Sequence, residues 1–184
     1  MKGKLACALV ALMLVFVLVP NVSATSDTSM DELDDSIQNE YSQIKFTDRS
    51  VAILSDTDVG ENVSSALSQS TSKLDIADSF NVAATKDIAV IDGVWAATKE
   101  TSMVKNGVKT LIENNNAVIL LDDSAELIKE SGASVGLVGF ADDSQVHAII
   151  NTSDGVTYCC SFGGFDDIDD AMLVAYNWAD KTMN

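Results

Sequence analysis

Three short, strongly apolar runs separated by helix-like segments constrain the fold of this chain more than any other feature. The runs are Ser50–Ser55 (SVAILS), Asp87–Ile91 (DIAVI) and Ala117–Leu121 (AVILL). Each is rich in β-branched residues and lacks the apolar–polar alternation of a strand with one wet face, so each is typical of a strand buried on both faces. Between them, residues 61–73 and 98–113 place apolar side chains at helical spacing. Strands that alternate with helices predict crossover connections and a mostly parallel sheet.

The rest of the chain predicts further elements of the same kinds. In chain order they are an edge strand over Leu74–Ala77, a helix over Ser124–Lys129, a strand over Val135–Phe140, two strands over Gln145–Ile150 and Val156–Phe162, and a helix over Asp166–Lys181. Two short strands joined by a Ser-Asp-Gly turn are typical of an antiparallel meander. We therefore predict an α/β fold: a three-layer, flavodoxin-like, mostly parallel sheet with an added C-terminal antiparallel meander and a final helix. The alternative is an α/β sheet with the same elements in another order.

Residues 1–24 have the pattern of a signal peptide. Lys2 and Lys4 precede an unbroken apolar run, Leu5–Val19, and the residues that a signal peptidase accepts follow at Val22–Ala24. The apolar run is shorter than the about 20 residues of a membrane-spanning helix, so cleavage is the prediction and an uncleaved N-terminal anchor is the alternative. The sequence therefore predicts a secreted or cell-surface protein with no transmembrane span once the signal is removed.

The length and charge of the chain narrow its organisation and its classes of partner. Residues 25–43 are polar and acidic and predict a flexible spacer, and residues 44–184 suit a single α/β domain. The whole chain has a net charge of −17, which repels nucleic acid and anionic lipid surfaces. The partners that remain are a cell-surface protein or a small-molecule ligand.

Two adjacent cysteines, Cys159 and Cys160, remain after signal cleavage. Because they are neighbours in sequence, a bond between them cannot join distant parts of the fold. In a strand, their thiols point to opposite faces. An exported protein meets oxidising conditions, so a strained vicinal disulfide or a bond to another chain is the alternative.

Acidic residues follow the predicted buried strands at their carboxyl ends. In open α/β sheets ligands bind just beyond those ends, so the sequence predicts a ligand-binding rim there. Its candidate residues are Asp56, Asp58, Asp92, Trp95, Asp122 and Asp123. Clustered carboxylates suit weakly bound Ca²⁺ or Mg²⁺, with Asp56, Asp58 and Asp92 as the candidate metal ligands. The alternative is that these side chains only cap helices.

The segment Val51–Asp58, an apolar strand followed by Asp-x-Asp, resembles the first motif of haloacid-dehalogenase-type phosphatases. The resemblance implies that Asp56 would be the nucleophile and Asp58 the general acid/base. It also implies that the pair Asp142–Asp143 would bind the metal. The sequence departs from that family at Gly60, where the family usually has a threonine, and it has no clear Ser/Thr or Lys motif between the two acidic motifs.

Other catalytic classes lack the residues they need. His147, the only histidine, lies in a predicted strand, and no G-x-S-x-G, G-x-x-x-x-G-K-[ST], G-x-G-x-x-G or C-x-x-C motif is present. We therefore expect a non-enzymatic exported module that binds a ligand or partner through the strand-end rim. The alternative is a divalent-metal-dependent, phosphatase-like hydrolase that uses Asp56 and Asp58 with Asp92 or Asp122.

Overall fold

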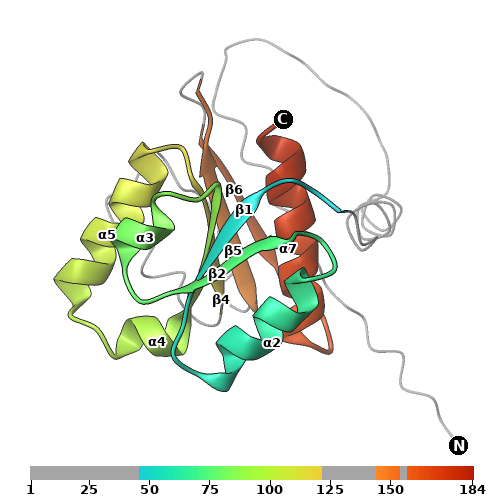
Figure 1. Cartoon of the computed structure of the whole chain (residues 1–184), viewed down its shortest axis with the longest axis horizontal. Helices are drawn as coiled ribbons and strands as arrows, with labels where there is room; N and C mark the ends of the chain where they lie inside the picture. Colours follow the sequence, from blue (N-terminus) through green and yellow to red (C-terminus); the bar gives the residue numbers. More distant parts are fainter. Residues whose placement is uncertain (1–45, 122–143, 154–156) are drawn as a thin grey trace, which may run out of the picture.

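A computed structural model describes residues 46–121, 144–153 and 157–184 (Figure 1). Within these ranges six strands form one mixed sheet in the order β2-β1-β3-β4-β5-β6. The strands are β1 (Ser50–Leu54), β2 (Lys73–Ala77), β3 (Ile88–Asp92), β4 (Ala117–Leu121), β5 (Val146–Asn151) and β6 (Thr157–Phe162). The helices are α2 (Asp58–Leu67), α3 (Phe80–Ala83), α4 (Gly93–Ala97), α5 (Thr101–Glu113) and α7 (Ile168–Thr182). The predicted signal peptide, spacer, helix 124–129 and strand 135–140 lie outside the described residues.

The directions of the strands follow the predicted pattern. β1 pairs in parallel with both β2 and β3, and β3 pairs in parallel with β4. β5 is antiparallel to β4, and β6 is antiparallel to β5. The predicted α/β class is therefore confirmed, and so are the antiparallel C-terminal strands and the final helix. Because β2 and β3 lie on opposite sides of β1, the strand order reverses between β1 and β3.

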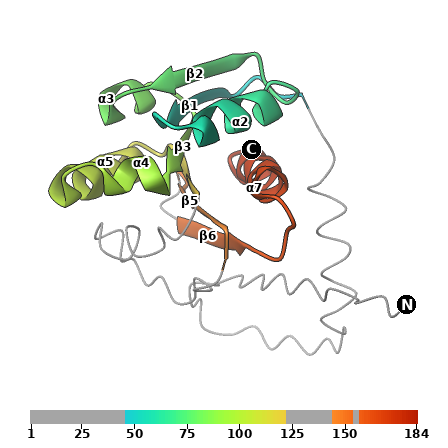
Figure 2. The same ribbon diagram turned by 90° about the horizontal axis from the view of Figure 1, so that it is seen from below.

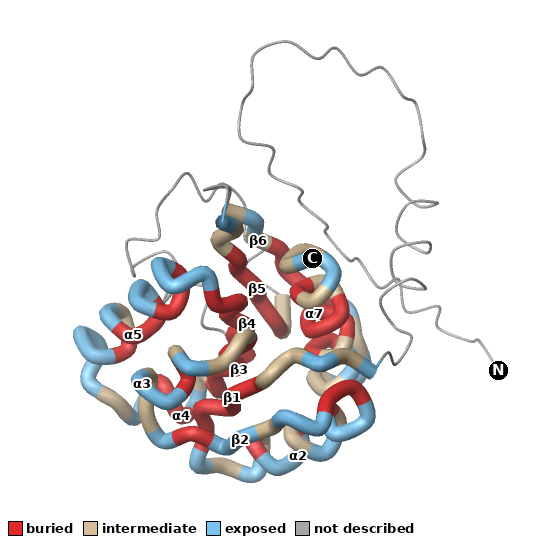
Figure 3. Tube along the Cα trace, turned by 45° about the horizontal axis from the view of Figure 1, so that its top comes forward, coloured by how far each residue is buried: buried red, intermediate tan, exposed pale blue. Residues whose placement is uncertain are grey.

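Burial on both faces of the sheet explains why the apolar runs show no alternation. Successive side chains of a strand point to opposite faces. Val51 and Ile53 pack in one hydrophobic cluster with α2 and α7, whereas Ala52 and Leu54 pack in another with α3, α4 and α5. Figure 2 shows these two groups of helices on opposite sides of the sheet, and Figure 3 shows that the buried positions follow β1, β3, β4 and β5, whereas the edge strand β2 is mostly exposed.

Side-chain caps explain two differences from the predicted helices, the early start of α2 and the presence of α4, whereas α5 begins later than predicted. The Thr57 hydroxyl accepts a hydrogen bond from the backbone two residues on, so α2 begins at Asp58 instead of residue 61. The Asp92 carboxylate caps α4 in the same way, and this short helix is absent from the prediction. The helix predicted to begin at residue 98 therefore begins at residue 101, as α5. Among the described helices, none has the length and apolar character needed to cross a membrane.

Charged hydrogen bonds join the first residue of β1 to Asp87, the residue before β3, at the amino-terminal end of both strands. Ser50 donates to Oδ2 of Asp87 from its backbone N–H (2.7 Å) and from its hydroxyl (2.8 Å). Burial raises the pKa of Asp87, but these hydrogen bonds and the charges of Arg49 and Lys73 outweigh burial and hold the pKa below its ordinary value. The ionised carboxylate therefore stabilises this end of the sheet.

Candidate functional site

The ends of β1 and β3 meet where the strand order reverses, and the polar side chains there bind one another. Asp92, at the end of β3, has no exposed surface. Its Oδ2 accepts hydrogen bonds from the hydroxyls of Ser55 (2.7 Å) and Thr57 (2.6 Å), which lie just beyond β1. Its Oδ1 accepts a hydrogen bond from the backbone N–H of Val94 (2.8 Å). We call Ser55, Thr57 and Asp92 the switch-point network.

The switch-point network holds two helices as well as two strands. Asp92 caps α4, and Thr57 caps α2 by accepting a hydrogen bond from Val59 N (3.2 Å). Gly60 of α2 lies against Ser55, because a Cβ at this glycine would be only 2.7 Å from the Ser55 Cβ. The glycine therefore lets α2 approach the end of β1 closely.

Two other predicted rim residues, Asp56 and Trp95, share one lysine. The Lys99 Nζ lies 3.4 Å from Oδ2 of Asp56 and 5.1 Å from the centroid of the Trp95 ring. Trp95 itself is only 2% exposed and belongs to the hydrophobic cluster of α3, α4 and α5. An exposed ion pair of this kind contributes up to about 1 kcal/mol. Trp95 is thus mainly a core residue, and the Lys99 ammonium group lies over its ring.

The three candidate metal ligands do not assemble. Asp58 is exposed in the first turn of α2, Asp56 pairs with Lys99, and Asp92 is enclosed by the switch-point network. In the described part of the chain, no three His, Cys, Asp or Glu side chains are grouped so that they could hold a metal ion. The remaining acidic candidates lie outside the described residues: Asp122, Asp123 and the pair Asp142–Asp143.

The cysteine pair, Cys159 and Cys160, lies on β6 with free thiols. Cys159 packs on the face of α3, α4 and α5, and Cys160 packs on the face of α2 and α7. Burial raises the pKa of both thiols to about 12, with a smaller contribution from Cys160 to the pKa of Cys159. A vicinal disulfide would have to bring both sulfurs to one side of the strand.

The single histidine forms a buried pair with a serine. His147 on β5 lies opposite Ser161 on β6, and its Nδ1 is 3.0 Å from the Ser161 Oγ. The two residues are 1% and 4% exposed. A nucleophile and its base must reach a substrate, so this enclosed pair is not presented for catalysis.

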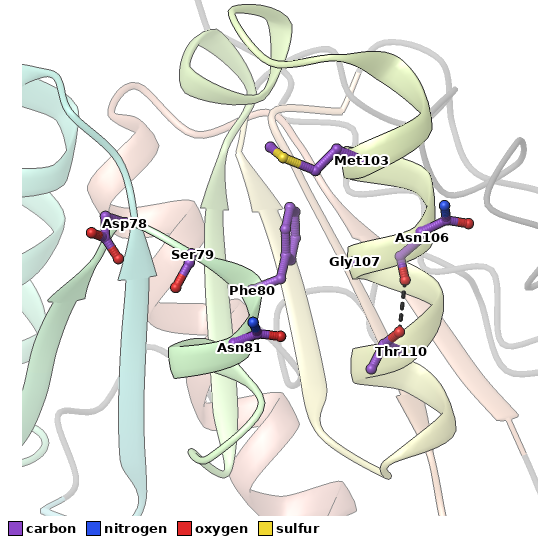
Figure 4. A pocket seen from close by; sticks show the side chains of 8 residues that line it. All are labelled: Asp78, Ser79, Phe80, Asn81, Met103, Asn106, Gly107 and Thr110. Atoms are coloured by element: carbon purple, nitrogen blue, oxygen red, sulfur yellow. Dashed lines mark hydrogen bonds between the residues drawn. The ribbon is translucent and has the colours of Figure 1, made fainter.

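A hollow of about 380 Å³ lies between α3 and α5, beside the end of β2 (Figure 4). Its lining residues are Asp78, Ser79, Phe80, Asn81, Met103, Asn106, Gly107 and Thr110. We call it the α3–α5 groove. Asp78 and Ser79 directly follow β2, so the groove begins at the carboxyl end of a parallel strand, where ligands of open α/β sheets bind.

Phe80 forms the apolar floor of the α3–α5 groove. Figure 4 shows its ring standing between α3 and α5, close to Met103. A Cβ at Gly107 would overlap this ring, so the ring lies directly against the backbone of α5. On another side the ring contacts Trp95, with 5.7 Å between ring centroids and an interplanar angle of 58°. A glycine inside a helix costs about 1 kcal/mol relative to alanine, and here that glycine makes room for a fixed aromatic ring.

Two sequence signals point to the α3–α5 groove, although the predicted rim includes neither. The strand-end rule applied to the edge strand Leu74–Ala77 identifies Asp78 and Ser79, which follow it directly. Gly107 lies in the middle of an amphipathic helix, and an interior helix glycine often marks a close approach. Neither signal by itself places the two segments side by side, because only the folded sheet brings α3 against α5.

Comparison of the chain with protein-family models, with curated proteins and with solved structures found no match.

Proposed function

We propose that the protein is an exported, non-enzymatic α/β module that binds a ligand or a partner at the strand-end rim of its sheet. The observation that carries the proposal is the state of Asp92, the fully buried carboxylate at the point where the strand order reverses. One of its oxygens accepts hydrogen bonds from the hydroxyls of Ser55 and Thr57, and the other accepts a hydrogen bond from the backbone N–H of Val94. These polar groups hold strands and helices together.

A catalytic or metal-binding role would require Asp92 to turn an oxygen toward a substrate or a cation. A hydrogen bond to a charged group contributes about 1.5–3 kcal/mol, and two hydroxyls donate to the same oxygen here. A general base or nucleophile must also lie within hydrogen-bond reach of the substrate, whereas Asp92 has no exposed surface. This geometry favours a binding module over a phosphatase-like hydrolase.

Two further features support the finer parts of the proposal. The strand order β2-β1-β3-β4-β5 is the order of flavodoxin-like sheets, and helices cover both faces, which favours a three-layer, flavodoxin-like arrangement. The antiparallel direction of β5 is a departure from that pattern. The signal-peptide pattern of residues 1–24 favours export, so we propose that binding takes place at or outside the cell surface.

Thermal melts test the proposal, combined with an assay for hydrolysis of p-nitrophenyl phosphate. A ligand that binds only the folded state raises the Tm. We expect the purified protein to have the same Tm in EDTA, in Mg²⁺ and in Ca²⁺, and to show no hydrolysis above the rate without protein. A metal-dependent rise in Tm that disappears in Asp92→Asn and accompanies hydrolysis would overturn the proposal.

The variants separate a structural role of Asp92 from a catalytic one. Asp92→Asn is expected to lower the Tm in EDTA as much as in Mg²⁺, because it weakens the switch-point network whether or not metal is present. Asp166→Asn is the matched control, since it removes the same charge from an exposed position just before α7. We expect this control to melt like the wild type in every buffer.

A further inference from the structure

We infer that the α3–α5 groove binds an organic cation, an alkyl ammonium or guanidinium group, with the charge at Asp78 and the alkyl chain on Phe80 and Met103. The inference rests on the proposed function and adds to it the class of ligand and the place of binding. Three observations carry it: Asp78 has no cationic partner among the described residues, Ser79 and Asn81 near it make no side-chain hydrogen bond to a described residue, and the Phe80 ring is held in place.

Asp78 is the only charged residue among those that line the groove, and its side chain is exposed. Four aspartates elsewhere pair with a cation of the chain, Asp48 with Lys73, Asp56 with Lys99, Asp75 with Lys86, and Asp180 with Arg49, whereas Asp58 and Asp166 make no such pair among the described residues. Within the residues that the structure describes, Asp78 has no such partner. A ligand cation would supply the missing charge, and the net charge of −17 attracts cations to the surface.

Polar side chains around Asp78 are available to bind N–H donors. Ser79 is the N-cap residue of α3, but its side chain makes no capping hydrogen bond. The side chains of Asn81 and Asn106 make no hydrogen bond to any other described residue. Thr110 is different, because its hydroxyl donates to the Asn106 carbonyl (2.8 Å, dashed line in Figure 4). Figure 4 shows Ser79 and Asn81 on the Asp78 side of the Phe80 ring, whereas Asn106 lies across the ring on α5 with its side chain turned away. Ser79 and Asn81 therefore offer the acceptor oxygens nearest the carboxylate.

The apolar part of the groove suits a short alkyl chain. Met103 is 45% exposed, and the Phe80 ring is held between Gly107 and Trp95. A floor that is already fixed lowers the entropy cost of binding, because little has to be ordered when the ligand arrives. The volume of about 380 Å³ lies at the small end of the range for small-molecule sites, about 300–1,000 Å³. One amine with a few methylenes fits these dimensions.

Other classes of ligand fit the groove less well. An anion would meet Asp78 without a positive lining residue to balance it. A divalent metal ion takes about six or more oxygen ligands, whereas the groove offers a single carboxylate. A wholly apolar ligand would cover Asp78 without pairing it, which costs desolvation energy.

Titration with n-pentylamine and agmatine tests the inference, with n-pentanol as the uncharged analogue of matching length. Calorimetry or NMR shifts of groove residues report the Kd. We expect both amines to bind more tightly than pentanol and to bind more weakly as the ionic strength rises. Asp78→Asn should raise the Kd of either amine up to about fivefold, the upper value for an exposed ion pair. D78K, which places an ammonium group in the groove itself, should abolish binding.

Asp166→Asn is the matched control, because it removes the same charge from an exposed residue just before α7. Its Kd should stay within about twofold of the wild-type value. Equal affinity for pentanol and pentylamine, or an unchanged Kd in Asp78→Asn, would overturn the inference. Failure of both amines to bind at about 10 mM would overturn it as well. The metal melts and the hydrolysis assay would still decide the proposed function separately.

A lysine-rich peptide distinguishes the two sources of this chemistry. Tighter binding of the peptide than of pentylamine, lost in Asp78→Asn, assigns the groove to a basic side chain of a partner protein. Tighter binding of the free amines assigns it to a small molecule. Both outcomes support the cation site, whereas peptide binding that is equal in Asp78→Asn would contradict it.

Discussion

Replacement of Asp92 by alanine should destabilise the protein by about 4 kcal/mol. The substitution removes the N-cap of α4, which contributes about 1 kcal/mol. It also removes two hydrogen bonds from the hydroxyls of Ser55 and Thr57 to a charged, buried oxygen, each worth at least about 1.5 kcal/mol. Ser55 is only 6% exposed, so after the substitution its hydroxyl depends on Thr57 as its remaining partner.

Urea denaturation followed by tryptophan fluorescence measures this loss. Asp58→Ala is the control, and as an exposed acid in a first helical turn it should cost at most about 1 kcal/mol. A double-mutant cycle of Asp92→Ala with Ser55→Ala should give a coupling energy of about 1.5–3 kcal/mol. An Asp92→Ala loss below about 1 kcal/mol, or additive effects in the cycle, would refute the structural role of the switch-point network.

Three more predictions follow from particular contacts. Gly107→Ala should lower the free energy of unfolding by about 1–3 kcal/mol despite its better helix propensity, because the new methyl group must displace Phe80; an unchanged urea midpoint would contradict the contact. Asp87, whose pKa is lowered mainly by Ser50, contributes stability that is fully present above about pH 4 and is lost as the pH falls through the lowered pKa. The difference in Tm between wild type and Asp87→Asn should therefore stay constant from about pH 7 to about pH 5 and shrink as the pH falls below about 4. The cysteine pair, with pKa values of about 12, should react with iodoacetamide at roughly pH 8 far more slowly in the native protein than in urea, and equal rates would contradict the burial of these thiols.

Strands could be predicted from the sequence because a strand buried on both faces requires an uninterrupted run of apolar residues, which is visible locally. Ala117–Leu121 is a strand over the predicted residues, and β1 and β3 differ from their predictions at their ends only. A short apolar run that is rich in β-branched residues is typical of a buried strand, so it can be assigned without knowledge of distant parts of the chain. The alternation of such runs with helices then leads to the α/β class.

The roles of the acidic residues could not be predicted in this way. Asp56 and Asp92 occupy similar places after neighbouring strands, yet Asp56 is exposed beside Lys99 and Asp92 is fully buried against Ser55. Whether an aspartate caps a helix, pairs with a lysine or binds a ligand depends on side chains that other elements bring to it. The α3–α5 groove could not be predicted for the same reason. Its Asp78 follows β2, whereas its Phe80 ring lies against Gly107 of α5, and only the folded chain brings these segments together.

The switch-point network and the α3–α5 groove are connected through Trp95. Asp92 starts α4, α4 carries Trp95, and the Trp95 ring holds one side of Phe80, the floor of the groove. Hydrogen bonds at the centre of the sheet thus fix a surface at its edge. Asp92→Ala should therefore weaken amine binding as well as stability, although Asp92 does not line the groove. Titration of pentylamine into this variant below its Tm measures the effect, and an unchanged Kd would show that Gly107 alone is enough to position Phe80.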